Sequence, residues 1–77
     1  METYVADTLE YRDTETECND VIVWFTVPKE WAEKWCIRNG WKSLKEFDME
    51  YIWDDSYEMY TRAQEDGVII HTMEEFE

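Results

Sequence analysis

The sequence predicts an α+β fold, a small two-layer sandwich in which a three-stranded antiparallel sheet packs against about three short helices. Two observations lead to this prediction. Segments rich in β-branched and aromatic residues, 3–11 and 21–27, come first, and another apolar segment, 68–73, comes last. The stretch between them has helical periodicity, so the order is β-β-α-α-α-β. The 77 residues are expected to form a single domain, residues 1–77.

Aromatic side chains supply the apolar surface that so small a chain needs. The sequence holds five Trp, five Tyr and three Phe, and each of these side chains can bury roughly 150–250 Å². Strongly acidic chains are often disordered because they lack such surface. Here the aromatic content predicts a folded domain with its own core.

The first two strands are expected to pair as an antiparallel ribbon. Val5, Leu9 and Tyr11 alternate with Tyr4, Ala6, Thr8 and Glu10 over 3–11, a pattern that predicts a strand. Residues 12–20 are polar and contain a turn signal, which predicts a connection. Residues 21–27 are apolar at nearly every position, and this pattern predicts a central strand with both faces covered.

The first helix is expected from Lys29 to Asn39. Pro28 suits the first turn of a helix, and Gly40 occupies a natural position just past its end. One helical face carries the apolar side chains that should enter the core, and they are Trp31, Ala32, Trp35 and Cys36.

Two further helices follow. Ser43 and Glu46 have the spacing of a capping box, which predicts a short helix to about residue 51. The third helix should begin at Asp54 or Asp55, because either side chain can cap an N-terminus, and it should end at Gly67. The residues expected to be buried by these two helices are Leu44, Phe47, Tyr51, Met59, Tyr60 and Ala63.

The last strand, 68–73, is followed by a Glu-rich tail and contains the only histidine. In an apolar strand His71 is expected to be a satisfied strand residue rather than a general base. Neither Cys18 nor Cys36 lies in a nucleophile motif, and the chain has no glycine-rich phosphate loop. The sequence therefore predicts a protein that is not an enzyme, with no catalytic residues and no cofactor.

A metal site is also not expected. Asp54, Asp55 and Glu58 could offer oxygen ligands to a hard cation. However, the alternating carboxylates and central glycine of a calcium-binding loop are absent. Helix capping explains the paired aspartates with fewer assumptions.

The chain shows no signal for secretion or for the membrane. Met1 is followed by neither a basic segment nor an apolar one, and the longest apolar run, 21–25, is too short to span a bilayer. We therefore expect a cytoplasmic protein without membrane contact, in which Cys18 and Cys36 are reduced thiols.

Charge is the strongest functional signal. The formal net charge is −13, and it is segregated: residues 1–20 carry −6, residues 21–45 carry +3 and residues 46–77 carry −10. The negative charges of such a folded domain repel one another, and this predicts a cationic partner that offsets them. The basic middle could also contact the acidic ends of a second copy, which would allow a homodimer.

Acidic side chains in two segments have spacings that approximate a row of phosphates. Carboxylates at alternate positions of an extended chain repeat at roughly 6.6 Å, and those three or four apart on a helix stand about 5–6 Å apart. A Lys- and Arg-lined nucleic-acid channel would accept such rows. Tyrosine beside them would be a good interface anchor. The predicted partner-binding residues are Asp13, Glu15, Glu17, Asp54, Asp55, Tyr57, Glu58, Glu65 and Asp66.

Small, acidic, aromatic-rich domains without catalytic motifs resemble the anti-defence proteins of bacterial viruses, especially anti-CRISPR proteins and DNA mimics. The resemblance is one of whole-chain composition, so no functional residue is carried over from it. It implies an inhibitor in the bacterial host cell that binds a basic partner, a nuclease or CRISPR–Cas effector, and no nucleic acid directly. The alternative is a small structural or regulatory interaction protein whose charge serves solubility only.

Overall fold

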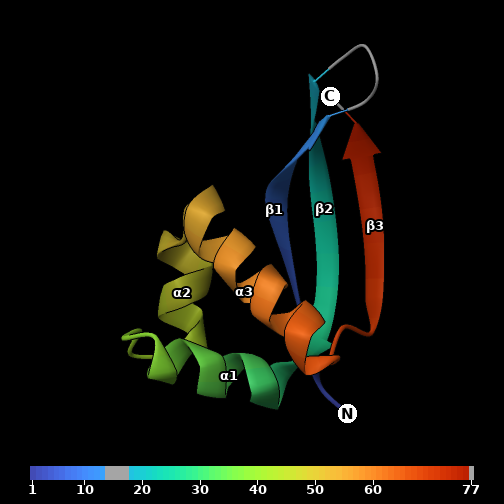
Figure 1. Ribbon diagram of the computed structural model, residues 1–77. Helices are drawn as coiled ribbons and strands as arrows, with labels where there is room; N and C mark the ends of the chain where they lie inside the picture. Colours follow the sequence, from blue (N-terminus) through green and yellow to red (C-terminus); the bar gives the residue numbers. More distant parts are fainter. Residues whose placement is uncertain (14–17, 77) are drawn as a thin grey trace.

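The computed structural model describes residues 1–13 and 18–76, which form three strands and three helices (Figure 1). The predicted three-stranded antiparallel sheet and the β-β-α-α-α-β order are confirmed. The elements are β1 (Thr3–Asp13), β2 (Cys18–Pro28), α1 (Lys29–Arg38), α2 (Leu44–Glu50), α3 (Trp53–Asp66) and β3 (His71–Phe76).

The sheet has the order β1-β2-β3, so the predicted central position of β2 is confirmed. Both neighbours pair with β2 in the antiparallel sense, and one row of the register joins Thr8, Val23 and Glu74. The β1–β2 ladder continues through Arg12 and Asn19. Part of the segment expected to be a polar connection is therefore strand, because backbone pairing continues beyond the apolar residues.

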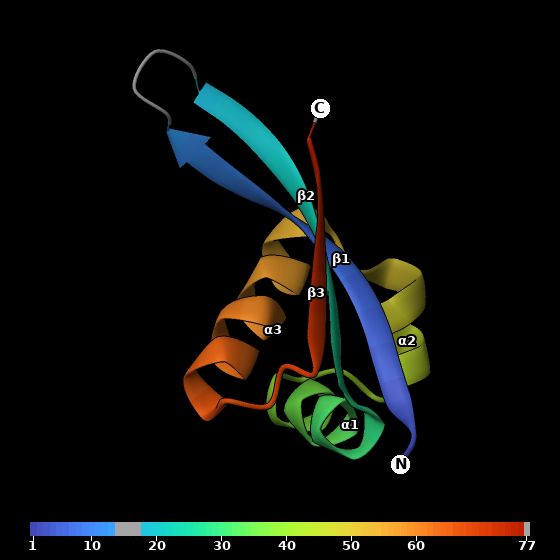
Figure 2. The same cartoon turned by 90° about the vertical axis from the view of Figure 1, so that its right-hand side faces the viewer.

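The two faces of β2 have different environments. Val21, Val23 and Phe25 are completely buried, whereas Trp24 between them is only half-buried. Figures 1 and 2 show that all three helices lie on one side of the sheet. The prediction that both faces of this strand are covered is wrong, because its second apolar row lies on the face without helices.

Helices α1 and α2 follow the predicted local signals. Pro28 immediately precedes α1, and Trp35 is buried while Trp31 is half-buried, so only one of these two tryptophans lies fully in the core. At the start of α2 the Ser43 Oγ accepts from the Glu46 backbone N–H at 3.1 Å. The Glu46 carboxylate accepts from the N–H of Lys42 at 2.7 Å, one residue earlier than in the expected capping box.

Helix α3 begins before the aspartates that were expected to cap it. Its N-cap is Ile52, and Asp54 and Asp55 lie in the first helical turn without a capping hydrogen bond. The capping prediction is therefore wrong, although both carboxylates still favour the helix dipole. Gly67 ends the helix as predicted, in the left-handed conformation with φ 68°.

Strand β3 begins three residues later than expected. Val68 and Ile69 pack against the core instead, and the Ile70 N–H donates to the Thr26 carbonyl at 2.8 Å. Glu74 and Glu75, expected to belong to a tail, are part of the strand. Local strand propensity places Val68 and Ile69 in the sheet, but in the structure they pack against the core before the strand begins.

The aromatic part of the core is centred on Phe47, which is completely buried. The predicted core positions on α2 and α3 are buried, except that Tyr51 is half-buried. The rings around Phe47 have centroid distances of 5.2–6.5 Å, and they are those of Tyr4, Trp35, Trp41 and Tyr51.

Candidate partner-binding surface

The first half of α3 carries acidic side chains that the fold leaves available. Asp54 and Glu58 are exposed, and Asp55 is half-buried. With i, i+3 and i, i+4 spacing, the Cβ atoms of these residues stand about 5–6 Å apart. None of the three forms an ion pair with another residue of the described ranges. Tyr57 lies beside them and is 43% exposed, which agrees with its predicted position off the buried stripe.

The second half of α3 is different because its acids have nearby partners. Arg62 lies 3.6 Å from Glu65 and 3.2 Å from Asp66. The Asp66 carboxylate also accepts from the Trp31 indole N–H at 2.9 Å. The predicted acidic residues of α3 therefore form an uncompensated group at the start of the helix and a locally compensated group at its end.

A shallow groove of about 380 Å³ runs along the exposed side of α3 between these groups. Glu58 also lines a neighbouring cleft of about 350 Å³ together with Trp35, Arg38 and Arg62. A cationic side chain entering the groove would meet the Glu58 carboxylate and the Tyr57 ring, groups of the kind that bind guanidinium and ammonium groups, with Arg62 at the same groove. The groove residues are Tyr57, Glu58, Thr61, Arg62 and Glu65.

The other predicted acidic row lies mostly outside the described residues. Glu15 and Glu17 lie outside the described residues, and Asp13 is described only as the last residue of the β1 backbone. In Figure 1 the start of α3 points toward the end of the sheet at which β1 ends and β2 begins. The uncompensated group therefore belongs to the part of α3 nearer to that end of the sheet.

Some acidic residues have a structural role that sequence reasoning missed. The Tyr4 hydroxyl donates to Asp48 at 3.0 Å, and the Tyr51 hydroxyl donates to Asp7. Burial, reinforced by these hydrogen bonds, raises the pKa of Tyr4 and raises the pKa of Tyr51 to about 12. Each pair is separated by 44 residues in the chain, so no local pattern announces it.

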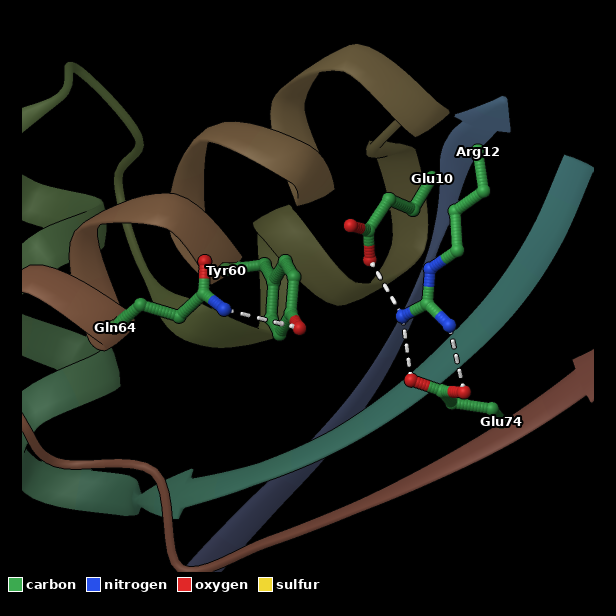
Figure 3. A network of polar contacts seen from close by, with 5 residues as sticks. All are labelled: Glu10, Arg12, Tyr60, Gln64 and Glu74. Carbon is green, nitrogen blue, oxygen red and sulfur yellow. Dashed lines mark hydrogen bonds and ion pairs between the residues drawn. The ribbon is translucent and has the colours of Figure 1, made fainter. Parts of the chain in front are cut away.

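Arg12 forms a second contact set that the sequence did not indicate (Figure 3). Its guanidinium donates to both carboxylate oxygens of Glu74, one of them at 2.8 Å, and to Glu10 at 3.3 Å. The hydrogen bonds from Arg12 lower the pKa of the Glu74 carboxyl. Because Glu10 and Glu74 come from β1 and β3, this cation links the two edge strands on the helix side of the sheet.

An exposed aromatic side chain at the start of α3 was also missed. Trp53 is 42% exposed and lines a groove of about 460 Å³ with Asp7, Tyr51 and Ile52. The helical pattern did not assign it to the buried stripe, but neither did it mark Trp53 as a contact residue. It lies directly beside Asp54, and it extends the aromatic character of the uncompensated acidic group.

The basic middle of the sequence gathers on α1 and on the turn after it. Lys34 pairs with Glu30 at 3.1 Å, and Lys29 pairs with Glu2 at 3.2 Å. A groove of about 540 Å³ between α1 and α2 is lined by Lys29, Lys42 and Lys45 among others. Figure 1 shows α1 at the end of the molecule away from the start of α3.

Within the described ranges, no three His, Cys, Asp or Glu side chains are grouped so that they could hold a metal ion. No helix there combines the length and the apolar character that a membrane crossing requires. Cys36 is a buried free thiol, and burial raises its pKa to about 11. No protein-family model, curated protein or solved structure matches this chain.

Proposed function

We propose that this chain is an acidic inhibitor that binds a basic nucleic-acid-handling enzyme in the cytoplasm of a bacterial host cell. The proposed target is a CRISPR–Cas effector, blocked by nucleic-acid mimicry or by steric occlusion. The observation that carries the proposal is the uncompensated acidic group at the start of α3, together with exposed Tyr57. The protein itself has no proposed catalytic, cofactor-binding or nucleic-acid-binding role.

The way in which α3 holds these carboxylates in fixed positions supports nucleic-acid mimicry. Helix α3 is held on the sheet by completely buried Met59 and Ala63, so its outer side chains project from a fixed backbone. Little backbone entropy is then lost when a partner binds. Lysines and arginines that normally bind phosphates would find carboxylates at a comparable spacing, with Tyr57 as an aromatic anchor.

Purified RNA-guided nucleases, each loaded with its guide, provide the test. Cleavage of a matched DNA target is measured while the chain is titrated, and inhibition near equimolar ratio is expected for the true target. The double variant Asp54→Asn with Glu58→Gln should inhibit about tenfold less well, on the scale expected for lost charge pairs. Glu30→Gln with Glu33→Gln, on α1, is the charge-matched control and should inhibit like the wild type.

Two results would contradict the proposal. In the first, no nuclease of the panel is inhibited at a large excess of the chain. In the second, the two double variants inhibit equally, which would mean that the position of the carboxylates is unimportant. Adding excess target DNA separates the two modes, because a mimic is displaced by competing nucleic acid and an occluding ligand bound elsewhere is not.

The alternative is a structural or regulatory interaction protein whose charge serves solubility only. One observation favours it: Asp7, Asp48 and Asp66 accept hydrogen bonds from tyrosine and tryptophan side chains, so part of the acidity is used inside the fold. It does not explain the uncompensated carboxylates at the start of α3. Complete absence of salt-dependent partners would favour this alternative.

A further inference from the structure

The face of the sheet that carries no helix has an apolar patch. Residues that are directly opposite in an antiparallel register lie on the same face, and Trp24 is opposite Met73 while Ile22 is opposite Leu9. Figure 2 shows that no element of the described chain covers this side. We call this set the sheet-face patch, and it consists of Val5, Leu9, Ile22, Trp24 and Met73.

The patch is unusual for so polar a protein. Val5 and Met73 are 53% and 52% exposed, and Trp24, Leu9 and Ile22 are half-buried between their neighbours. Leu9 and Ile22, and Trp24 and Met73, are cross-strand neighbours about 4.5–5.5 Å apart, and Val5 is diagonal to Trp24. These side chains form an apolar surface that Asp7, opposite Trp24, interrupts on β1. An exposed apolar patch on a soluble domain marks a place where another molecule binds.

Trp24 adds a second observation at the centre of the patch. Its indole Nε1 is the buried side-chain polar atom for which the described residues supply no hydrogen-bond partner. A buried donor without an acceptor carries a free-energy cost. An acceptor brought by a bound partner would remove this cost once the indole turns outward.

Charge around the patch indicates what the occupant is. Exposed Asp20 and Glu75 lie on this face by the register, whereas its described positions include no Lys or Arg. Arg12 lies on the other side, where Glu10 and Glu74 hold it. The register also places Asp7 and His71 on this face. Two copies meeting through it would oppose the carboxylates of each with no Lys or Arg of the described residues to pair them, which disfavours a second copy as the occupant.

We propose that the helix-free sheet face is the docking surface for a partner protein that presents an apolar centre flanked at one end by lysines or arginines. The proposal rests on the proposed function for the identity of that partner, the basic enzyme, but it assigns a different surface. Apolar burial on the sheet-face patch holds the complex, and Asp20 and Glu75 receive the flanking cations. Because α3 lies on the opposite side of the sheet, the two surfaces can be tested separately.

The probe is an extended peptide of about eight residues, alternating Leu and Lys, whose side chains match a strand-like apolar and cationic pattern. Its binding to the full chain is followed by amide chemical shifts and by titration. Shifts are expected at the sheet-face patch and at Asp20 and Glu75. Val5→Thr with Met73→Thr, which keeps strand-forming residues, should weaken binding about tenfold or more.

Matched controls separate the patch from general surface hydrophobicity. Ile37 and Met49 are 65% and 74% exposed but lie on α1 and α2, so Ile37→Gln with Met49→Gln should leave peptide affinity within about twofold. A peptide alternating Leu and Glu should not bind measurably. Met73→Gln alone, with a far-ultraviolet spectrum, keeps the test valid should the double variant not fold.

Several results would overturn the assignment. Shifts confined to α3, or unchanged affinity in the folded patch variants, would show that this face is not used. Equal binding of the Leu–Glu peptide would refute the basic partner, and a dimer in sedimentation that the patch variants abolish would identify a second copy. Peptide binding at the patch without inhibition of any nuclease would remove the proposed function alone, whereas inhibition that the patch variants retain would remove only this inference.

Discussion

Phe47 is the single residue on which most of the aromatic core depends. Its completely buried ring contacts rings from β1, from α1, from the connection after α1 and from the end of α2. A domain of this size has little other apolar surface to compensate for a lost core side chain. The stability of the whole chain is therefore unusually sensitive to this position.

Replacing Phe47 by alanine should lower the free energy of unfolding by about 3–5 kcal/mol, because a large cavity is left among rings that cannot collapse onto it. Denaturant unfolding followed by tryptophan fluorescence measures this loss. Met49→Ala, two residues along but 74% exposed, is the control and should change stability by less than about 0.5 kcal/mol. A small loss for Phe47→Ala would contradict the proposed organisation of the core.

The Tyr51–Asp7 hydrogen bond predicts a loss of stability in alkali. Burial and this bond raise the pKa of Tyr51 to about 12, above the value of about 10 in an unfolded chain. The folded state thus retains the Tyr51 proton more strongly than the unfolded chain does. The contribution of Tyr51 to the free energy of unfolding is therefore fully present below pH about 10 and is lost as pH rises toward about 12. Tyr51→Phe should reduce this dependence in denaturant melts between those pH values. An unchanged pH profile of stability in that variant would contradict this role of Tyr51.

At the scale of elements, the local sequence pattern predicts which segments form helices, but it does not predict where each helix begins. The i, i+4 spacing of apolar residues predicted α3 and its buried stripe, and Gly67 marked its end. Its start was wrong by one or two residues because tertiary contacts decide it: the Thr8 hydroxyl donates to the Trp53 carbonyl at 3.2 Å, and Ser56 donates to the Asp7 carbonyl. Such contacts with β1 have no signature in the sequence around the helix.

The candidate site, like the helix boundaries, was only partly predictable from the sequence. Acidic residues and exposed Tyr57 on α3 could be identified from composition and helical spacing. The ion pairs of Arg62 with Glu65 and Asp66 have i, i+3 and i, i+4 spacing, so this compensation could also be predicted locally. The hydrogen bond that Asp66 accepts from Trp31, 35 residues away in the chain, could not. The sheet-face patch was not predicted, because the apolar pattern of β2 predicts cover on both faces of this strand.

The two halves of α3 should respond differently to charge reversal. Glu58→Lys should speed dissociation from the inhibited nuclease about tenfold, since it opposes a cation at an uncompensated position. Glu65→Lys should have a smaller effect, because Arg62 already offsets that carboxylate at 3.6 Å. Surface plasmon resonance against the inhibited nuclease gives both rates. Equal effects of the two reversals would show that only total charge is important.

At the scale of the whole molecule, the uncompensated acidic group of α3 and the sheet-face patch belong to different sides of the sheet. The net charge of −13 is concentrated in the two terminal thirds, and the sheet-face patch lies on the side that α3 does not occupy. The charge gives long-range attraction that salt screens, and the sheet-face patch gives short-range apolar burial that salt does not weaken. A partner that uses both surfaces would be attracted electrostatically and retained by apolar contact.

Affinity for the inhibited nuclease should therefore fall as salt increases, because screening tightens to about 8 Å at physiological ionic strength. Calorimetric titration at several salt concentrations measures the slope. Val5→Thr with Met73→Thr should lower affinity at every concentration but leave the slope unchanged. Affinity that does not vary with salt would contradict an electrostatic role for the acidic surfaces.

The pairing of β2 has a consequence for how the chain folds during its synthesis. One edge of β2 pairs with β1, its neighbour in sequence, but the other waits for β3, which follows all three helices. The row that joins Val23 to Glu74 closes only when the last strand has left the ribosome. Until then a nascent hairpin shows an open backbone edge next to its most apolar residues, a template for wrong strand pairing. Mutual repulsion between neighbouring nascent chains, which acidity provides, would protect this intermediate in a polysome.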